Sequence, residues 1–217
     1  MSDASGIVPA GGVTVLVGPS GSGKSTLLRL CNRLEVPEAG VVRFRGDDLA
    51  SLDPLHFRRR VGMVFQRPTP FAGTVRENLQ VAEPALGDAG AAQALERVGL
   101  SGAFVDRDAR RLSGGEAQRV CLARTLVTEP EVVLMDEVTS SVDPSATRAL
   151  EELGSGLAAV GVPVLWVTHD LAQMHRLADH VLVVIEGRVV HAGEAAALES
   201  EASEAVREFL AGGATHE

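Results

Sequence analysis

A glycine-rich segment between an apolar run and a helical pattern most constrains how this chain can fold. Residues 18–26 read GPSGSGKST and follow VTVLV at Val13–Val17, a short apolar run typical of a buried parallel strand. Ser25–Leu34 then carries apolar residues at helical spacing. The segment fits G-x-x-x-x-G-K-[ST], a loop whose backbone N–H groups converge on phosphate oxygens. The strand before it and the helix after it favour a phosphate site over a chance glycine-rich turn.

Lys24 in this loop is unusual, because the 20 Lys and Arg residues of the chain comprise one lysine and 19 arginines. A compact ammonium fits a loop closed tightly around phosphate, whereas a planar guanidinium is wider. We therefore predict that Lys24 reaches the β- and γ-phosphates and that the Ser25 hydroxyl binds Mg²⁺. The predicted phosphate-binding residues are Gly18, Pro19, Ser20, Gly21, Ser22, Gly23, Lys24, Ser25 and Thr26.

Two adjacent carboxylates end a second predicted strand. Residues 131–137 read EVVLMDE, in which an apolar run leads directly into Asp136 and Glu137. An aspartate at the end of a buried strand can hold Mg²⁺, so we assign that role to Asp136. Glu137 points differently and can orient or deprotonate an attacking water. Taken alone the pair fits a solvated acidic strand end, but the neighbouring phosphate loop favours catalysis.

Gln66 and His169 also follow predicted strands, at Val61–Phe65 and Pro163–Val167. The carboxyl ends of parallel strands are where such folds bind ligands. We predict that Gln66 contacts Mg²⁺ and the γ-phosphate and that His169 donates a hydrogen bond to the γ-phosphate. Taken alone, each residue also fits a role without function. Gln66 would then be an ordinary polar surface residue, and His169 would be a structural histidine.

The segment LSGGEAQR at 112–119 predicts a second anion site. Ser113 can cap a helix that runs to Leu126, and Ser113–Glu116 matches a capping box. Its glycines place exposed N–H groups at a helix N-terminus. One nucleotide needs only one such cradle, so we predict that this site serves the nucleotide of a second copy in a head-to-tail homodimer. Its nucleotide-binding residues are Ser113, Gly114, Gly115 and Glu116.

The order of predicted elements indicates an α/β fold with a parallel sheet, interrupted by a helical insertion around residues 68–128.

The net charge of −9 argues against direct nucleic-acid binding, and the run Arg58–Arg60 is interpreted as a solvated helix face. No apolar run approaches the roughly 20 residues of a membrane span, so no direct membrane insertion is expected. Cys31 and Cys121 are expected to be core residues of a protein in a reducing compartment, without a disulfide.

Taken in order, these motifs resemble the ATP-binding cassette (ABC) family of ATPases. GPSGSGKST resembles the Walker A motif, VVLMDE the Walker B motif with its catalytic glutamate, and LSGGE the family signature. Gln66 matches the Q-loop, Ser140–Asp143 the D-loop and His169 the switch histidine. The resemblance implies a single ABC ATPase domain over residues 1–217. It further implies a P-loop NTPase (RecA-like) core, an antiparallel β-subdomain and a helical subdomain that carries the signature.

The resemblance also implies a function. Two ATP molecules with Mg²⁺ would lie between two chains, with Asp143 at the nucleotide and Lys24, Gln66, Glu137 and His169 in catalysis. The chain would be cytoplasmic, peripheral on the inner face of the plasma membrane, and would power a separate permease that docks near Phe65–Phe71. QRPTPFAGTVRENL is similar to phosphate-import ATPases, whereas VLWVTHD and DEVTSSVD are similar to an iron- or metal-export subfamily. The cargo is therefore expected to be an inorganic ion, with both possibilities open.

Two alternative functions have less support. A soluble ABC ATPase in cofactor assembly or nucleic-acid remodelling would tend to carry coiled-coil insertions, tandem cassettes or basic arms. A small-molecule kinase would leave LSGGE unexplained.

The sequence departs from the family pattern at three points. Glu116 and Val138 stand where glutamine and proline are usual. No aromatic residue precedes Gly18 to stack on adenine. Either apolar side chains such as Ile7 and Val8 hold the base, or the natural start lies upstream.

Overall fold

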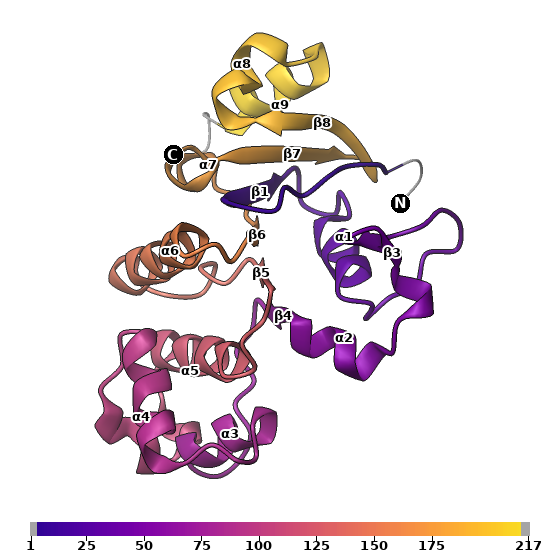
Figure 1. The fold of residues 1–217 in the computed structure, drawn as a ribbon. Coiled ribbons are helices and arrows are strands. Elements are labelled where there is room, and N and C mark those ends of the chain that lie inside the picture. The colour runs from indigo at the N-terminus through magenta and orange to yellow at the C-terminus, as the bar shows by residue number, and fades with distance from the viewer. Residues whose placement is uncertain (1–3, 214–217) are drawn as a thin grey trace.

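A six-stranded sheet in the order β4-β5-β6-β1-β7-β8 forms the centre of the fold (Figure 1). The structure is a computed structural model that describes residues 4–213. Strands β4, β5, β6, β1 and β7 pair in parallel, and β8 pairs antiparallel with β7. The strands are β1 (Val13–Val17), β4 (Val61–Val64), β5 (Val132–Asp136), β6 (Val164–Val167), β7 (His180–Ile185) and β8 (Arg188–Glu194). The expected α/β architecture is confirmed.

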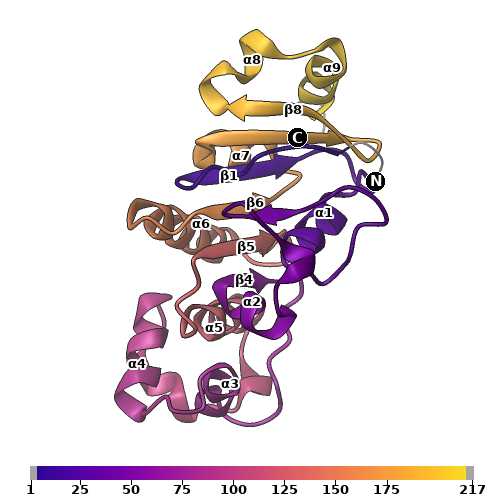
Figure 2. The same cartoon turned by 45° about the vertical axis from the view of Figure 1, so that its right-hand side comes forward.

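The apolar strands are buried on both faces, as a parallel sheet requires. Because side chains alternate along a strand, Val15 and Trp166 enter one core cluster, while Leu16 and Leu165 enter the other. Helices cover each face (Figures 1 and 2). The Leu16 side packs against α1 (Lys24–Cys31) and α2 (Pro54–Arg60). The Val15 side packs against α5 (Gly114–Leu126), α6 (Pro144–Ala159) and α7 (Leu171–Leu177).

The segment predicted as a helical insertion lies together beyond β4, at the bottom of Figure 1. Helices α3 and α4 pack against α5 there, and short 3₁₀ turns connect them. These elements are α3 (Val75–Ala82), α4 (Asp88–Arg97), η2 (Gly102–Asp106) and η3 (Ala109–Arg111). The buried apolar residues of α3 and α4 join the same core cluster as those of α5.

A two-stranded antiparallel ribbon lies on the α1 side of the sheet. It consists of β2 (Arg43–Phe44) and β3 (Asp47–Asp48), so the antiparallel β-subdomain implied by the resemblance is reduced to four paired residues. The ring of Phe44 packs edge-on against Phe57 of α2. The remaining elements are η1 (Leu49–Ser51), η4 (Ala195–Ala197), α8 (Leu198–Glu201) and α9 (Glu204–Gly213).

Element boundaries differ from the sequence predictions where local backbone geometry decides them. Helix α1 ends at Cys31, earlier than the predicted Leu34, because Arg33 adopts a left-handed conformation with φ of 58°. The predicted strand Val41–Phe44 keeps only its last two residues. Both cysteines are free, with Cys121 buried and Cys31 half-buried. No helix within residues 4–213 has the length and apolar character that a membrane crossing requires.

The sheet centre provides a test of this architecture. Leu165 is 1% exposed on β6, between β5 and β1. Leu165→Ala should lower the free energy of unfolding by about 2–5 kcal/mol, because it removes buried methyl groups and leaves a cavity. Val160→Ala is the matched control, since Val160 is 77% exposed and should change stability by less than about 0.5 kcal/mol. Equal urea midpoints for the two variants would show that Leu165 is not in the core.

Candidate active site

Four neighbouring parallel strands end at one edge of the sheet, and the predicted site residues follow them. The loop 18–23 follows β1, His169 comes just after β6, Asp136 ends β5, and Gln66 follows β4. Because β4, β5, β6 and β1 are adjacent and point the same way, these residues gather at one edge.

Tight backbone contacts hold the loop 18–23 in shape. Gly18 has a φ of 153°, and a Cβ at this position would lie 1.9 Å from the carbonyl oxygen of Val184. The N–H of Gly187, in the β7–β8 turn, donates to the Ser22 carbonyl at 3.0 Å. Gly23 caps α1 in a left-handed conformation, with φ of 101°. The glycines are therefore required by close approach and by backbone geometry, as the phosphate-loop motif predicts.

Lys24 lies inside this loop. Its Nζ donates to the carbonyl oxygens of Gly18 at 2.8 Å and Pro19 at 2.9 Å, and the residue is only 5% exposed. Burial lowers the pKa of the Lys24 ammonium, while the negative charges of Glu137 and Asp136 act in the opposite direction. The ammonium is thus held at the centre of the loop, beside two carboxylates.

Ser25 and Asp136 meet across the site. The Ser25 Oγ donates to Asp136 Oδ1 at 2.9 Å, and Asp136 is 5% exposed. Burial raises the pKa of Asp136, against the hydrogen bond from Ser25, and the Glu137 charge adds to the rise. A buried carboxylate next to a hydroxyl fits a hard divalent cation such as Mg²⁺, because both groups supply oxygen ligands. The described residues contain no cluster of three His, Cys, Asp or Glu that could hold a metal ion alone, so such a site needs further oxygen ligands, such as phosphate oxygens or water.

Glu137 occupies a special backbone position. Its φ is 45°, in the left-handed region that non-glycine residues rarely adopt and that is costly unless its surroundings enforce it. Its N–H donates to the Val167 carbonyl at 3.1 Å. Gln66 Nε2 donates to Glu137 Oε2 at 3.2 Å, and His169 Nδ1 lies 3.5 Å from the same oxygen. The structure therefore brings three of the four predicted catalytic side chains, those of Gln66, Glu137 and His169, together.

The signature segment forms the capping box that its sequence predicts. Ser113 Oγ accepts from the Glu116 N–H at 3.3 Å, and Glu116 Oε2 accepts from the Ser113 N–H at 2.7 Å. The backbone N–H of Ser113 lowers the pKa of Glu116, and Arg107, whose Nη1 lies 3.0 Å from Glu116 Oε1, acts in the same direction. The glutamate that replaces the usual glutamine is thus accommodated as an ionised group.

The signature segment is not part of the site around Lys24 within one chain. In residues 4–213 no hydrogen bond joins Ser113–Glu116 to the loop 18–26. Asp143 caps the neighbouring helix α6, where its Oδ1 accepts from the N–H groups of Ser145 and Ala146. A Cβ at Gly115 would lie 2.9 Å from Ala146 Cβ, so the two helix starts are in close contact.

Two polar contacts behind the site have no counterpart among the residues predicted from the sequence. Gln118 of α5, fully buried, donates through Nε2 to the Phe65 carbonyl at 2.9 Å. Gln173 of α7 receives a hydrogen bond from the buried Trp166 indole at 3.2 Å. The second contact had a detectable signal, because a buried indole N–H needs an acceptor.

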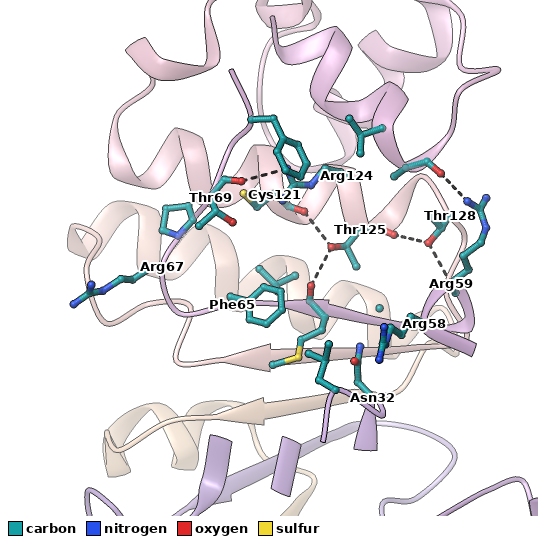
Figure 3. A pocket seen from close by; sticks show the side chains of 18 of the residues that line it. Asn32, Arg58, Arg59, Phe65, Arg67, Thr69, Cys121, Arg124, Thr125 and Thr128 are labelled. Atoms are coloured by element: carbon teal, nitrogen blue, oxygen red, sulfur yellow. Dashed lines mark hydrogen bonds between the residues drawn. The ribbon is translucent and has the colours of Figure 1, made fainter. Parts of the chain in front are cut away.

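A groove of about 680 Å³ lies between α2, β4, the loop after β4 and α5 (Figure 3). Phe65 and Phe71 line it and are 42% and 51% exposed. The guanidinium of Arg124 stacks 4.6 Å from the centre of the Phe71 ring. Arg59 lies at one end of the groove and is held there by the Ala82 carbonyl and Glu83. Four arginines but no carboxylate line the groove in the described part of the chain: Arg58, Arg59, Arg67 and Arg124.

Comparisons with known proteins agree with this geometry. The sequence profile of the family described as ABC transporter matches residues 1–140. Protein STAR1 of Oryza sativa subsp. japonica is 42% identical over 94% of this chain and 60% of its own length. Phosphate import ATP-binding protein PstB 2 of Mycobacterium tuberculosis is 44% identical over 85% of this chain and 72% of its own length. Methionine import ATP-binding protein MetN of Caulobacter vibrioides is 43% identical over 86% and 59%. The chain thus spans about 60% of STAR1 and MetN.

A solved structure shows the same fold. It is cbiO1 of Clostridium perfringens, described as part of the ABC transporter complex cbiONQ. It superimposes with a TM-score of 0.79 at 28% identity, over 94% of this chain and 86% of that one.

The chain combines a parallel sheet, a phosphate loop and carboxylates at strand ends. Together these features identify it as a P-loop NTPase. The family profile and the relatives make the assignment more specific: the chain belongs to the ABC transporter family, as an ATP-binding ATPase. ATP and Mg²⁺ are the cofactors of this family's ATPase subunits.

Two glycines of the loop offer a matched test of its geometry. A Cβ at position 18 would collide with the Val184 carbonyl, whereas a Cβ at Gly21 would meet no atom within 4 Å. Both positions have positive φ, so both alanine variants carry backbone strain. Gly18→Ala should therefore weaken binding of a fluorescent ATP analogue at least about tenfold more than Gly21→Ala, a difference of about 1.4 kcal/mol. Equal affinities would contradict the close packing of the loop on β7.

Proposed function

We propose that this chain hydrolyses ATP to power solute transport through a separate membrane permease. The observation that carries the proposal is the convergence of Gln66, Glu137 and His169 beside the loop that holds Lys24. The proposed phosphate-binding residues are those of the loop 18–26, and the proposed Mg²⁺ ligands are Ser25, Asp136 and Gln66.

The proposed roles follow from the geometry. Glu137 acts as the base, because its carboxylate lies at the site edge and can accept a proton from water at hydrogen-bonding distance. Gln66 and His169 both face Glu137 Oε2 and hold that carboxylate in place. Lys24 exchanges two backbone carbonyls for phosphate oxygens when ATP binds, which neutralises negative charge where it develops. Bound Mg²⁺ supplies Lewis-acid stabilisation of the phosphate oxygens.

We further propose a head-to-tail homodimer. Ser113, Gly114, Gly115, Glu116 and Asp143 would complete the nucleotide site of the opposite chain. Two facts support this arrangement: the signature segment makes no hydrogen bond to its own phosphate loop, and the helix starts that carry Ser113 and Asp143 lie against each other. The Ser113 hydroxyl accepts a hydrogen bond inside its cap and still has its own proton to donate.

Glu137→Gln tests the catalytic assignment and the dimer together. The substitution keeps the shape of the side chain but removes the base, so turnover should fall by at least about 10²-fold while ATP still binds. Light scattering with ATP and Mg²⁺ should then show a stable dimer. The same variant with Ser113→Arg is the control, because the added bulk should block the shared site and leave monomers. Normal turnover by Glu137→Gln would remove Glu137 from the mechanism, and a monomer with bound ATP would contradict the dimer.

The chain is proposed to be one ABC ATPase domain over residues 1–217, with a helical subdomain at about 68–128. Packing of α3 and α4 on α5 supports this division. Location in the cytoplasm, on the inner face of the plasma membrane, would follow from binding to the permease. The cargo is proposed to be a small solute, with phosphate import or metal export favoured by the sequence resemblances and methionine also represented among the relatives.

The groove at Phe65–Phe71 is the proposed permease site. Its exposed aromatic rings and four arginines fit a short amphipathic segment that carries apolar and acidic side chains.

Phe71→Ala should reduce capture of a permease from detergent-solubilised membranes at least about tenfold, because buried aromatic anchors dominate such interfaces. The ATPase activity of the isolated chain should change little. Val160→Ala, at an exposed site that does not line the groove, is the control. Undiminished capture by Phe71→Ala would place the permease elsewhere.

A further inference from the structure

A buried polar cluster lies directly behind the catalytic edge. Gln173 is 1% exposed and Trp166 is fully buried. The Trp166 Nε1–H donates to Gln173 Oε1 at 3.2 Å, and Gln173 Nε2 donates to Glu151 Oε1 at 2.8 Å. The Thr139 hydroxyl lies 3.3 Å from Gln173 Oε1 and 3.2 Å from Gln173 Nε2. Arg176 holds Glu151 in turn, through two hydrogen bonds of 3.2 and 2.8 Å.

The orientation of the Gln173 amide is fixed by its neighbours. An indole N–H can only donate, so the amide oxygen must face Trp166. The ionised Glu151 can only accept, so the amide nitrogen must face it. Only the Thr139 hydroxyl can serve both amide atoms, because it donates and accepts. Neither glutamate nor an apolar residue at position 173 could make this set of contacts.

The cluster connects the two strand-end segments that carry catalytic side chains. Thr139 lies two residues after Glu137, and Gln173 lies four residues after His169, in the first turn of α7. Asp170 caps α7 and accepts a hydrogen bond from the Gln173 backbone N–H at 3.1 Å. Displacement of the Gln173 side chain would therefore shift the backbone both in the loop after β5 and at the start of α7.

The loop after β5 needs such support. Glu137 is held in the left-handed region, and its carbonyl accepts from the Ser140 N–H at 3.0 Å in a tight turn. The Thr139 side chain makes its hydrogen bonds with Gln173, so the amide is a polar anchor of this turn, beside the buried apolar side chain of Val138. Strained backbone of this kind persists only where the surroundings determine it.

We propose that Gln173 is a positioning residue for hydrolysis, which sets the distance between Glu137 and His169 through Thr139 and Trp166. The inference rests on the catalytic roles proposed above for Glu137 and His169. In the part of the chain that the structure describes, Gln173 makes no hydrogen bond to Glu137, to His169 or to the loop 18–26; it acts through the backbone turn on one side and the first turn of α7 on the other. The His169–Glu137 separation of 3.5 Å is the geometry that it maintains.

Gln173→Met is the primary test, because methionine has a similar length but neither donates nor accepts as the amide does. The expected result is a fall in kcat of about tenfold with the KM for ATP changed less than about twofold. Ground-state binding should survive because no hydrogen bond among the described residues joins the loop 18–26 to the cluster. Arg176→Met is the control: it removes a partner of Glu151 and should lower the melting temperature, but it leaves Gln173 bound to Thr139 and Trp166. Equal loss of kcat in both variants would show a purely structural effect and overturn the inference.

Thr139 provides a second route should Gln173→Met fail to fold. Thr139→Val keeps the shape and removes the hydroxyl, and it should reproduce the kcat loss, whereas Thr139→Ser should restore most of it. The double variant with Gln173→Met should be no worse than either single variant, because both changes break one network. Additive losses, or full activity in Thr139→Val, would overturn the inference.

Trp166 supplies a readout that is independent of turnover, because it is the only tryptophan in the chain. Its single indole N–H resonance should shift in Gln173→Met without nucleotide, and Arg176→Met should leave it near its wild-type position. A shifted resonance with unchanged kcat would reject the positioning role while the proposed function stands. Normal turnover in Glu137→Gln, measured alongside, would instead reject the proposed function on which the inference depends.

Discussion

Parallel pairing of four strands is the constraint on which the site depends. Strands β4, β5, β6 and β1 run side by side in one direction, so their carboxyl ends meet at one edge although they are far apart in sequence. Ser25 and Asp136 are separated by 111 positions, yet their side chains are hydrogen-bonded at 2.9 Å. A shift of one residue in the register between β5 and β6 would also turn Leu165 and Trp166 to the wrong faces. The apolar packing that stabilises the sheet therefore also sets the geometry of the charged edge.

The charges at this edge are balanced only in part within the chain. Lys24 faces two carboxylates, and burial raises the pKa of Asp136 while it lowers that of Lys24. Both shifts reflect the cost of keeping ions out of water. Bound ATP would offer phosphate oxygens to Lys24, and Mg²⁺ would offer positive charge to Asp136, so ligand binding would relieve an electrostatic cost that the folded chain already bears. Glu116 differs, since Arg107 and the backbone N–H of Ser113 both bond its carboxylate and lower its pKa.

Much of the fold could be predicted because it is encoded locally. The apolar runs predicted the buried strands, and Ser113 marked a helix start that the structure confirms. The end of α1 could not be predicted, since it depends on the left-handed backbone of Arg33, which the arginine side chain does not signal.

The site was predictable wherever a motif carries its own chemistry, as Lys24 and Asp136 do. Gln173 was not, because a glutamine on a helix is usually solvated and its partners lie on three other segments. Long-range polar contacts of this kind require the tertiary structure.

The β7–β8 hairpin affects the entropy change of nucleotide binding, because it holds the backbone of the phosphate loop. Its turn donates from Gly187 to Ser22, and the Val184 carbonyl of β7 lies against Gly18, so contacts within the chain hold the shape of the loop 18–23. The entropy of ordering that backbone is lost during folding and not at the moment of association. In the proposed function, the Lys24 side chain would exchange its two carbonyl partners for phosphate oxygens. Nucleotide binding would then require a rotamer change of one side chain on a loop whose backbone is ordered by folding.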